Sequence, residues 1–267
     1  MIDYLHMTPL IIAFVFTFGA IIGSFTNAVL WRLRTGETVL HGRSYCPSCK
    51  HTLGPADLIP LLSYLALGGK CRHCEAEIGA HYLWVELGMG VLYVAATFAV
   101  MREYGPAFGG IGLAALLLHW YFMTMFVIIF VYDWRYMLIL RKVTLPATII
   151  AVIANLALAV PPTSIAIGML VGWGFFAAQY AVSKGRWVGG GDPWLGLLMG
   201  AVLGWPLVAL ALFMAYIGGA LVGSVLLLTR RAHMQSQLAF GTFLSVAAVV
   251  TLLYGDRILV WYLTLLA

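Results

Sequence analysis

Long apolar runs joined by short polar loops dominate this chain and restrict it to one structural class. A helix needs roughly 20 apolar residues to cross the hydrocarbon core of a bilayer. The runs that approach this length lie at about 10–31, 83–101, 112–132, 144–160, 164–183, 193–204, 206–228 and 239–254. With 63% hydrophobic and 9% charged residues, the chain lacks the charge that a soluble domain needs on its surface. We therefore predict an all-α polytopic membrane protein in a lipid bilayer, with about eight transmembrane helices.

The helix count depends on how the apolar runs are divided. Roughly six to nine crossings fit the pattern, because several runs are short and 193–228 could form one bent helix instead of two. The run from Pro9 to Trp31 lacks the basic start and the clear cleavage site of a signal peptide. We expect it to be the first transmembrane helix.

Basic residues predict the orientation. If the N-terminus lies outside and the chain crosses eight times, only Arg102 and Arg257 fall on the outer side. The others fall in the inner loops: Arg32, Arg34, Arg43, Lys50, Lys70, Arg72, Arg135, Arg141, Lys142, Lys184, Arg186, Arg230 and Arg231. Lys and Arg concentrate in cytoplasmic loops, so we predict that these loops face the cytoplasm. The net charge of +5 is then an orientation signal, and we expect no nucleic-acid partner.

A polar insert at about 32–82 separates the first transmembrane helix (1–31) from the remaining helical core (83–267). It contains all four cysteines, as Cys46-Pro47-Ser48-Cys49 and Cys71-Arg72-His73-Cys74. Two such turns brought together form a tetrahedral sulfur site suited to zinc, and four thiolates leave no open position for a catalytic water. We predict a small zinc-binding cytoplasmic insert with a structural metal. Two disulfides are the alternative, which a reducing cytoplasm disfavours.

Two aspartates stand where apolar runs meet short basic loops. Asp133 follows an apolar run, and Asp192 directly follows Gly189, Gly190 and Gly191. Carboxyls at membrane depth are costly and usually functional, and two that approach each other can supply the acid and the base for peptide hydrolysis. Glycines would let a substrate strand come close or allow unusual backbone dihedrals. We predict that Asp133 and Asp192 are a catalytic pair; the alternative for Asp192 is an ordinary helix cap.

Taken together, these features resemble the bacterial type IV prepilin peptidases, a family of GxGD intramembrane aspartic proteases. The resemblance runs through nearly the whole chain. Besides the cysteine pairs and the two aspartates, it rests on Gly23-Ser24-Phe25-Thr26-Asn27 with Arg32, Ile59-Pro60-Leu61-Leu62-Ser63-Tyr64, Gly69-Lys70, Tyr82 with Glu86, Arg135 and Phe240-Gly241.

The resemblance implies two reactions. A peptidase of this family removes a short basic leader from type IV prepilin or pseudopilin precursors at the cytoplasmic face of the bacterial inner membrane. The same enzymes commonly methylate the new N-terminus with S-adenosylmethionine, an activity associated with the insert. Glu86, Asn27 and Arg32 are the candidate residues for methyl transfer.

Three positions depart from the family pattern. Leu140 and Arg34 stand where proline is common, and Trp194 stands where the family usually has a lysine. Without that lysine a cation beside the second aspartate is missing. We expect catalysis to survive, with changes in pH optimum and substrate choice.

Other functions fit the sequence less well. A presenilin-like protease shares the tyrosine–aspartate and glycine–aspartate patterns but does not explain the cysteines. A proton-coupled transporter could use the two aspartates as a relay, although we find no inverted repeat. A non-catalytic assembly factor with a zinc insert is a third alternative.

Overall fold

The computed structural model describes residues 9–39, 41–105, 109–230 and 238–266. Within these ranges the regular secondary structure is helical, and the extended pairs are isolated bridges. The chain divides into two compact units, Met1–Thr124 and Met125–Ala267, and the division falls inside the long helix α4 (Gly110–Tyr136). The predicted all-helical membrane class is confirmed.

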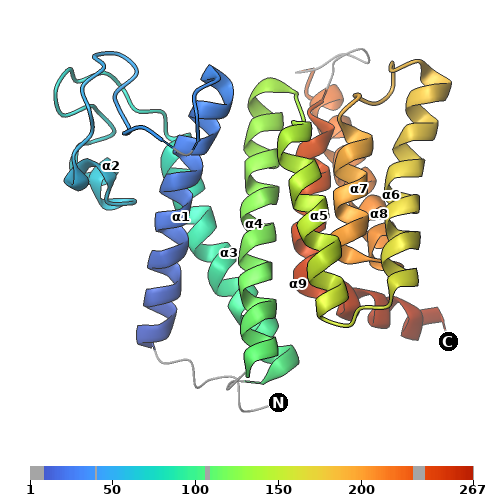
Figure 1. Ribbon diagram of the computed structural model, residues 1–267. Coiled ribbons are helices and arrows are strands. Elements are labelled where there is room, and N and C mark those ends of the chain that lie inside the picture. The colour runs from blue at the N-terminus through green and yellow to red at the C-terminus, as the bar shows by residue number, and fades with distance from the viewer. Residues whose placement is uncertain (1–8, 40, 106–108, 231–237, 267) are drawn as a thin grey trace. The chain divides into compact units, whose positions relative to one another are not determined.

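In the N-terminal unit, α1 (Pro9–Thr35) and α3 (His81–Tyr104) pack along each other (Figure 1). Small residues make this possible: a Cβ on Gly19 would lie 2.7 Å from the Met89 carbonyl oxygen, and one on Gly23 would lie 2.7 Å from the Glu86 Cα. Close backbone approach at glycines is how helices associate in lipid, where there is no hydrophobic driving force between them.

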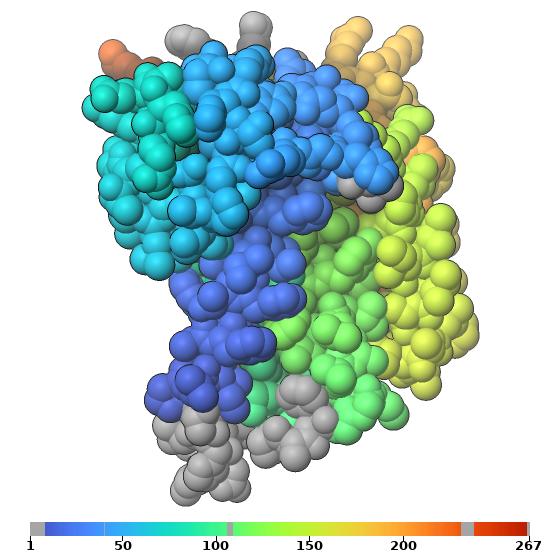
Figure 2. Space-filling view, turned by 60° about the vertical axis from the view of Figure 1, so that its left-hand side comes forward, coloured from blue at the N-terminus to red at the C-terminus, as the bar shows by residue number. Residues whose placement is uncertain are grey.

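The polar insert follows α1 and carries the short helices η2 (Pro55–Leu58) and α2 (Leu62–Ala66). It has little regular structure of its own, so its fold depends on turns, side-chain bonds and a cysteine cluster. Figure 2 shows it as one rounded mass at the C-terminal end of α1.

In the C-terminal unit, the end of α4 is followed by five helices: α5 (Arg141–Ala157), α6 (Pro162–Ser183), α7 (Asp192–Leu203), α8 (Leu207–Leu228) and α9 (Phe240–Leu266). The helices α6 and α7 lie side by side (Figure 1). Their contact is made of glycines, since a Cβ on Gly172 would overlap the Gly196 carbonyl and one on Gly200 would overlap the Gly168 carbonyl.

Each of the eight predicted runs corresponds to a helix, but only some have spanning length. Six helices in the described residues are long and apolar enough to cross a membrane: α1, α3, α4, α6, α8 and α9. The helices α5 and α7 have 17 and 12 residues. Residues 193–228 form two helices, because the chain breaks after Leu203 at Gly204, whose φ is +67°. The multi-pass architecture is established, and the count of eight crossings stays a prediction.

Candidate active site, metal centre and cavity

Asp133 lies in the last turn of α4 and is 4% exposed. Its Oδ2 accepts a hydrogen bond from the backbone N–H of Thr242, 3.0 Å away in the first turn of α9, and Gly241 supplies a second backbone donor. A Cβ on Gly241 would lie 2.8 Å from the same oxygen. The position of the Asp133 carboxyl therefore requires a glycine at 241.

Asp192 is the first residue of α7 and is 5% exposed. Its Oδ2 accepts the backbone N–H of Gly189 at 2.6 Å, which closes the glycine loop on the carboxyl. None of the three loop glycines has a positive φ, so the expected unusual dihedrals are not what they provide here. Glycine is required at 191 because there is no room for a side chain: a Cβ on Gly191 would lie 2.7 Å from the Cβ of Ile139.

The two aspartates come together within the C-terminal unit. Ile139, in the loop after α4, joins their surroundings: its Cδ1 would lie 2.9 Å from a Cβ on Gly241, and its Cβ faces Gly191. Sequence reasoning missed the parts played by Ile139 and Thr242. Phe240-Gly241 was the available signal, but it pointed to the family without indicating a role.

The missing lysine has a partial substitute. The Arg141 guanidinium lies over the ring of Trp194, 4.8 Å from its centroid. Leu140 directly precedes α5, and its carbonyl accepts the backbone N–H groups of Val143 and Thr144. A cation therefore stands beside the residue that replaced the lysine, contributed by a different segment.

The four cysteines meet as predicted. Their sulfur atoms all lie within 4.8 Å of one another, and those of Cys46 and Cys74 are 3.8 Å apart. A tetrahedral site with Zn–S bonds of about 2.3 Å has sulfurs about 3.8 Å apart, so the cluster fits zinc. All four thiols are free in the described chain, so the disulfide alternative is wrong for this structure.

Both cysteine turns have the same backbone design. Lys50 N–H donates to the Cys46 carbonyl and Glu75 N–H donates to the Cys71 carbonyl, and both donor residues have positive φ, 60° and 56°. The backbone N–H of Cys49 lowers the pKa of the Cys46 thiol to about 6. A thiol that ionises this readily is suited to bind a metal as thiolate.

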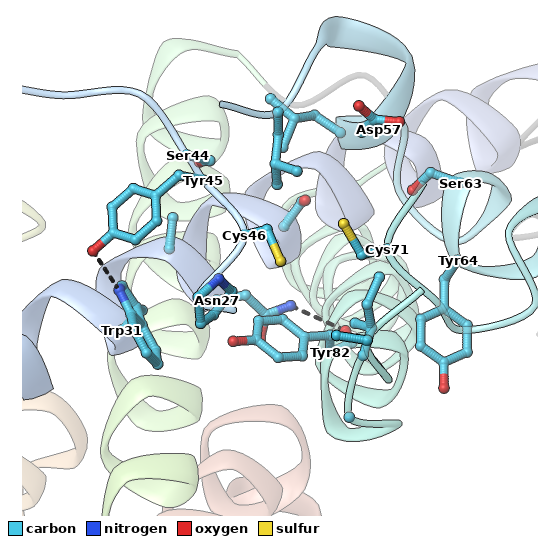
Figure 3. Close-up of a pocket in the computed structure, with 18 of the residues that line it drawn as sticks. Asn27, Trp31, Ser44, Tyr45, Cys46, Asp57, Ser63, Tyr64, Cys71 and Tyr82 are labelled. Atoms are coloured by element: carbon cyan, nitrogen blue, oxygen red, sulfur yellow. Dashed lines mark hydrogen bonds between the residues drawn. The ribbon is translucent and has the colours of Figure 1, made fainter. Parts of the chain in front are cut away.

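Next to this cluster, the N-terminal unit encloses a cavity of about 300 Å³ (Figure 3). All three candidate methyl-transfer residues, Asn27, Arg32 and Glu86, line it. Two of them also hold the insert. Arg32 donates to the carbonyls of Val39 (2.9 Å) and Gly42 (2.7 Å). Glu86 accepts the backbone N–H of Leu61 at 2.8 Å.

Aromatic side chains form part of the cavity wall, and sequence reasoning assigned them no function there. Trp31 Nε1 donates to the Tyr45 hydroxyl at 3.3 Å (Figure 3). That hydroxyl donates to Glu37 at 2.6 Å. The bond from Tyr45 holds the pKa of Glu37 below its usual range. Tyr82 receives the amide N–H of Asn27 on its backbone carbonyl at 3.0 Å.

Comparison with known proteins agrees with these observations. Residues 17–100 match the family model described as the bacterial peptidase A24 N-terminal domain, and residues 120–224 match that of the type IV leader peptidase family. A prepilin leader peptidase/N-methyltransferase of Aeromonas hydrophila is 32% identical over 99% of this chain and 98% of its own length. Proteins of the same name from Bacillus subtilis (33% identical; 94% of this chain, 98% of the relative) and Pseudomonas aeruginosa (32% identical; 98% and 97%) are also similar. No solved structure matches the chain significantly.

Proposed function

Because this chain belongs to the type IV leader peptidase family, we propose that it is a membrane-embedded aspartic endopeptidase that also N-methylates its product. Its substrates are type IV prepilin or pseudopilin precursors, from which it removes the basic leader. The observation that carries the peptidase assignment is the pairing of two buried carboxyls, Asp133 and Asp192, each held by a backbone N–H group, with Ile139 packed beside both the Gly191 loop and Gly241.

The chemistry follows from this pairing. When two carboxyls lie close together in a site with little water, ionising both costs free energy because the two negative charges repel. The pair therefore shares one proton. The ionised member takes a proton from water, while the protonated member polarises the carbonyl of the scissile peptide bond. The loop Gly189–Gly191 leaves room for extended substrate backbone beside Asp192.

The reaction takes place at the cytoplasmic face of the bacterial inner membrane. The basic loops support this side, because Arg135 and Arg141 follow Asp133, and Lys184 and Arg186 precede Asp192. With the dyad at this level of the membrane, the basic leader of the precursor would lie in the cytoplasm and its apolar segment in the lipid.

Methylation of the new N-terminus uses S-adenosylmethionine and involves the insert at 32–82. Three curated relatives that cover nearly the whole chain carry this activity in their names. Asn27, Arg32 and Glu86 are the proposed methyl-transfer residues. The zinc bound by Cys46, Cys49, Cys71 and Cys74 is structural, since four sulfur ligands complete its coordination.

The proton-coupled transporter is not supported, because the family and these relatives are peptidases.

The test uses the purified full chain, a pilin-like precursor and S-adenosylmethionine, with the product sequenced and weighed. Asp133→Asn and Asp192→Asn should each abolish cleavage. Asp256→Asn is the matched control, because that carboxyl is exposed on α9. Normal cleavage by either dyad variant would refute the peptidase assignment. A product without the mass of one added methyl group would refute the second activity alone.

A further inference from the structure

The polar insert contains one apolar segment, at residues 58–67, and none of the residues of this segment is buried. Three of its large side chains stand on the outer surface: Ile59 (47% exposed), Leu62 (65%) and Leu65 (65%). We call these three residues the apolar patch. Because the segment adds no buried side chain to the insert, a core of the insert does not explain its apolar character. Exposed apolar surface of this kind marks contact with a partner or a membrane.

The helix α2 turns its apolar side outward. Leu62 and Leu65 are three residues apart, so their side chains project from the same side of the helix. Its two polar residues, Ser63 and Tyr64, are less exposed and line the cavity of the N-terminal unit. A helix on a water-exposed domain has the opposite arrangement, with polar residues outside. The surroundings of α2 on its outer side are therefore apolar.

A hydrogen bond holds the patch at the level of the membrane-spanning helices. Leu61, which lies between Ile59 and Leu62, donates its backbone N–H to Glu86 Oε2 at 2.8 Å. Glu86 is the sixth residue of α3, a helix of spanning length, so its Cα lies about 7.5 Å along the axis from the first residue. Figure 1 shows α2 beside the C-terminal half of α1 and not beyond its end. The patch therefore lies alongside the spans.

Both spans expose aromatic side chains at this level. On α3, Trp84 is 64% exposed and stands two residues before Glu86. On α1, Phe25 is 54% exposed and stands two residues after Gly23, where a Cβ would lie 2.7 Å from the Glu86 Cα. Tryptophan is enriched where a membrane meets water, and apolar side chains exposed on a spanning helix face lipid. The patch is thus continuous with a surface that lipid covers.

We propose that the apolar patch is immersed in the interfacial layer of the bilayer and docks the insert on the membrane surface. The exposed Lys70, three residues after the apolar segment, supplies a cation for the headgroup phosphates. Three apolar side chains would bind a membrane only weakly by themselves. Because α1 and α3 tether the insert to the bilayer at both ends, the docking is intramolecular and a small patch suffices. The proposal depends on neither of the two reactions.

Lipid contact at single positions tests the proposal. The zinc-loaded full chain, with an environment-sensitive fluorescent amino acid in place of Leu62, is reconstituted into phosphatidylcholine nanodiscs that contain a lipid with an acyl-chain nitroxide. We expect a blue-shifted emission and the loss of most of the fluorescence to the nitroxide. The same label in place of Thr52 is the matched control, since Thr52 is an exposed polar residue of the insert. We expect little quenching there.

A variant measures how far the docking depends on the patch. With the label at position 62, Ile59→Gln combined with Leu65→Gln should weaken the association of the insert with lipid by at least about tenfold, because burial of one such side chain contributes a factor of that order. Most of the quenching should then be lost. His41→Gln combined with Thr52→Gln is the control, since both residues are exposed and lie outside the patch. An unchanged metal content shows that the insert of each variant is folded.

The remaining outcomes would overturn the proposal. A red-shifted emission without quenching at position 62 would place the patch in water. A blue-shifted emission without quenching would mean that protein covers the patch, such as a second copy of the chain. Equal quenching at positions 62 and 52, or quenching that survives the double substitution, would mean that the insert lies near lipid without using the patch.

Discussion

The carboxyls of the C-terminal unit and the polar groups of the N-terminal cavity are held by different means. Asp133 and Asp192 are fixed by backbone N–H groups of Thr242 and Gly189. At the neighbouring Gly241 and Gly191 there is no room for a side chain. In the cavity, Arg32 and Glu86 reach by side chain to an insert with little core of its own. We therefore expect the first site to be sensitive to added atoms, and the second to loss of a metal bound by the cysteine cluster of the insert.

The largest effect is expected from Gly241→Ala. The added Cβ would lie 2.8 Å from Asp133 Oδ2 and 2.9 Å from Ile139 Cδ1, which displaces the carboxyl. Misplacement by about 1 Å can lower the rate roughly 100-fold, so we expect kcat to fall at least that far with little change in the binding of S-adenosylmethionine. Gly218→Ala is the control, since its nearest neighbour is 3.8 Å away. An unimpaired Gly241→Ala enzyme would show that the dyad is not held this way.

Metal removal should affect the insert more than it affects cleavage by the dyad, the reverse of the effect expected from Gly241→Ala. Because a small insert gains much of its folding free energy from a structural metal, chelation should expose residues 41–80 to protease and weaken the binding of S-adenosylmethionine by about tenfold or more. Cleavage by the dyad should change far less. Metal analysis, limited proteolysis and calorimetry on one preparation measure all three. A metal-free insert that resists protease as well as the native one would contradict the zinc prediction.

A smaller effect is expected at Trp194, one of the positions that depart from the family pattern. Arg141→Gln removes the cation over the Trp194 ring, a contact worth about 0.5–1 kcal/mol at an exposed site. We expect precursor KM to rise about two- to fivefold at nearly constant kcat. Lys142→Gln, the adjacent exposed cation, is the comparison. Equal effects of the two substitutions would mean that only the general charge of the loop matters.

The smallest effect should come from the ion pair of the insert. Arg72 Nε donates to Asp57 Oδ1 at 2.8 Å and holds the pKa of Asp57 below its usual range, but the Arg72 side chain is 52% exposed. Such pairs contribute at most about 1 kcal/mol. Arg72→Gln should leave the protease resistance of the zinc-loaded insert nearly unchanged. Resistance as low as that of the metal-free form would mean that the pair, and not the metal, holds the insert.

The sequence predicted most of the helices, because apolar runs and helices coincide in lipid. It placed the end of the last run at 254, whereas α9 continues to Leu266 through Asp256 and Arg257. A run defined by hydropathy ends at charged residues, whereas a helix can continue through them. The side chains of Asp256 and Arg257 are both exposed. The cysteine cluster was also predictable, since each pair is local in sequence. The family resemblance is confirmed.

The surroundings of the dyad were less accessible to sequence reasoning. Thr242 lies 109 residues from the carboxyl that it binds, and its donor is a backbone N–H that any residue except proline would supply. No side-chain pattern identifies such a contact. Likewise, Arg32 and Glu86 were predicted for methyl transfer, and their bonds to the Val39 and Leu61 backbones became visible only in three dimensions.

The glycine contact between α6 and α7 has a mechanical consequence. At Gly172 and Gly196 the two backbones touch without side chains between them, so neither helix can slide or rotate without colliding with the other. Asp192 stands at the tip of α7 and moves with that pair. We therefore expect that a movement of this carboxyl would involve α6 together with α7.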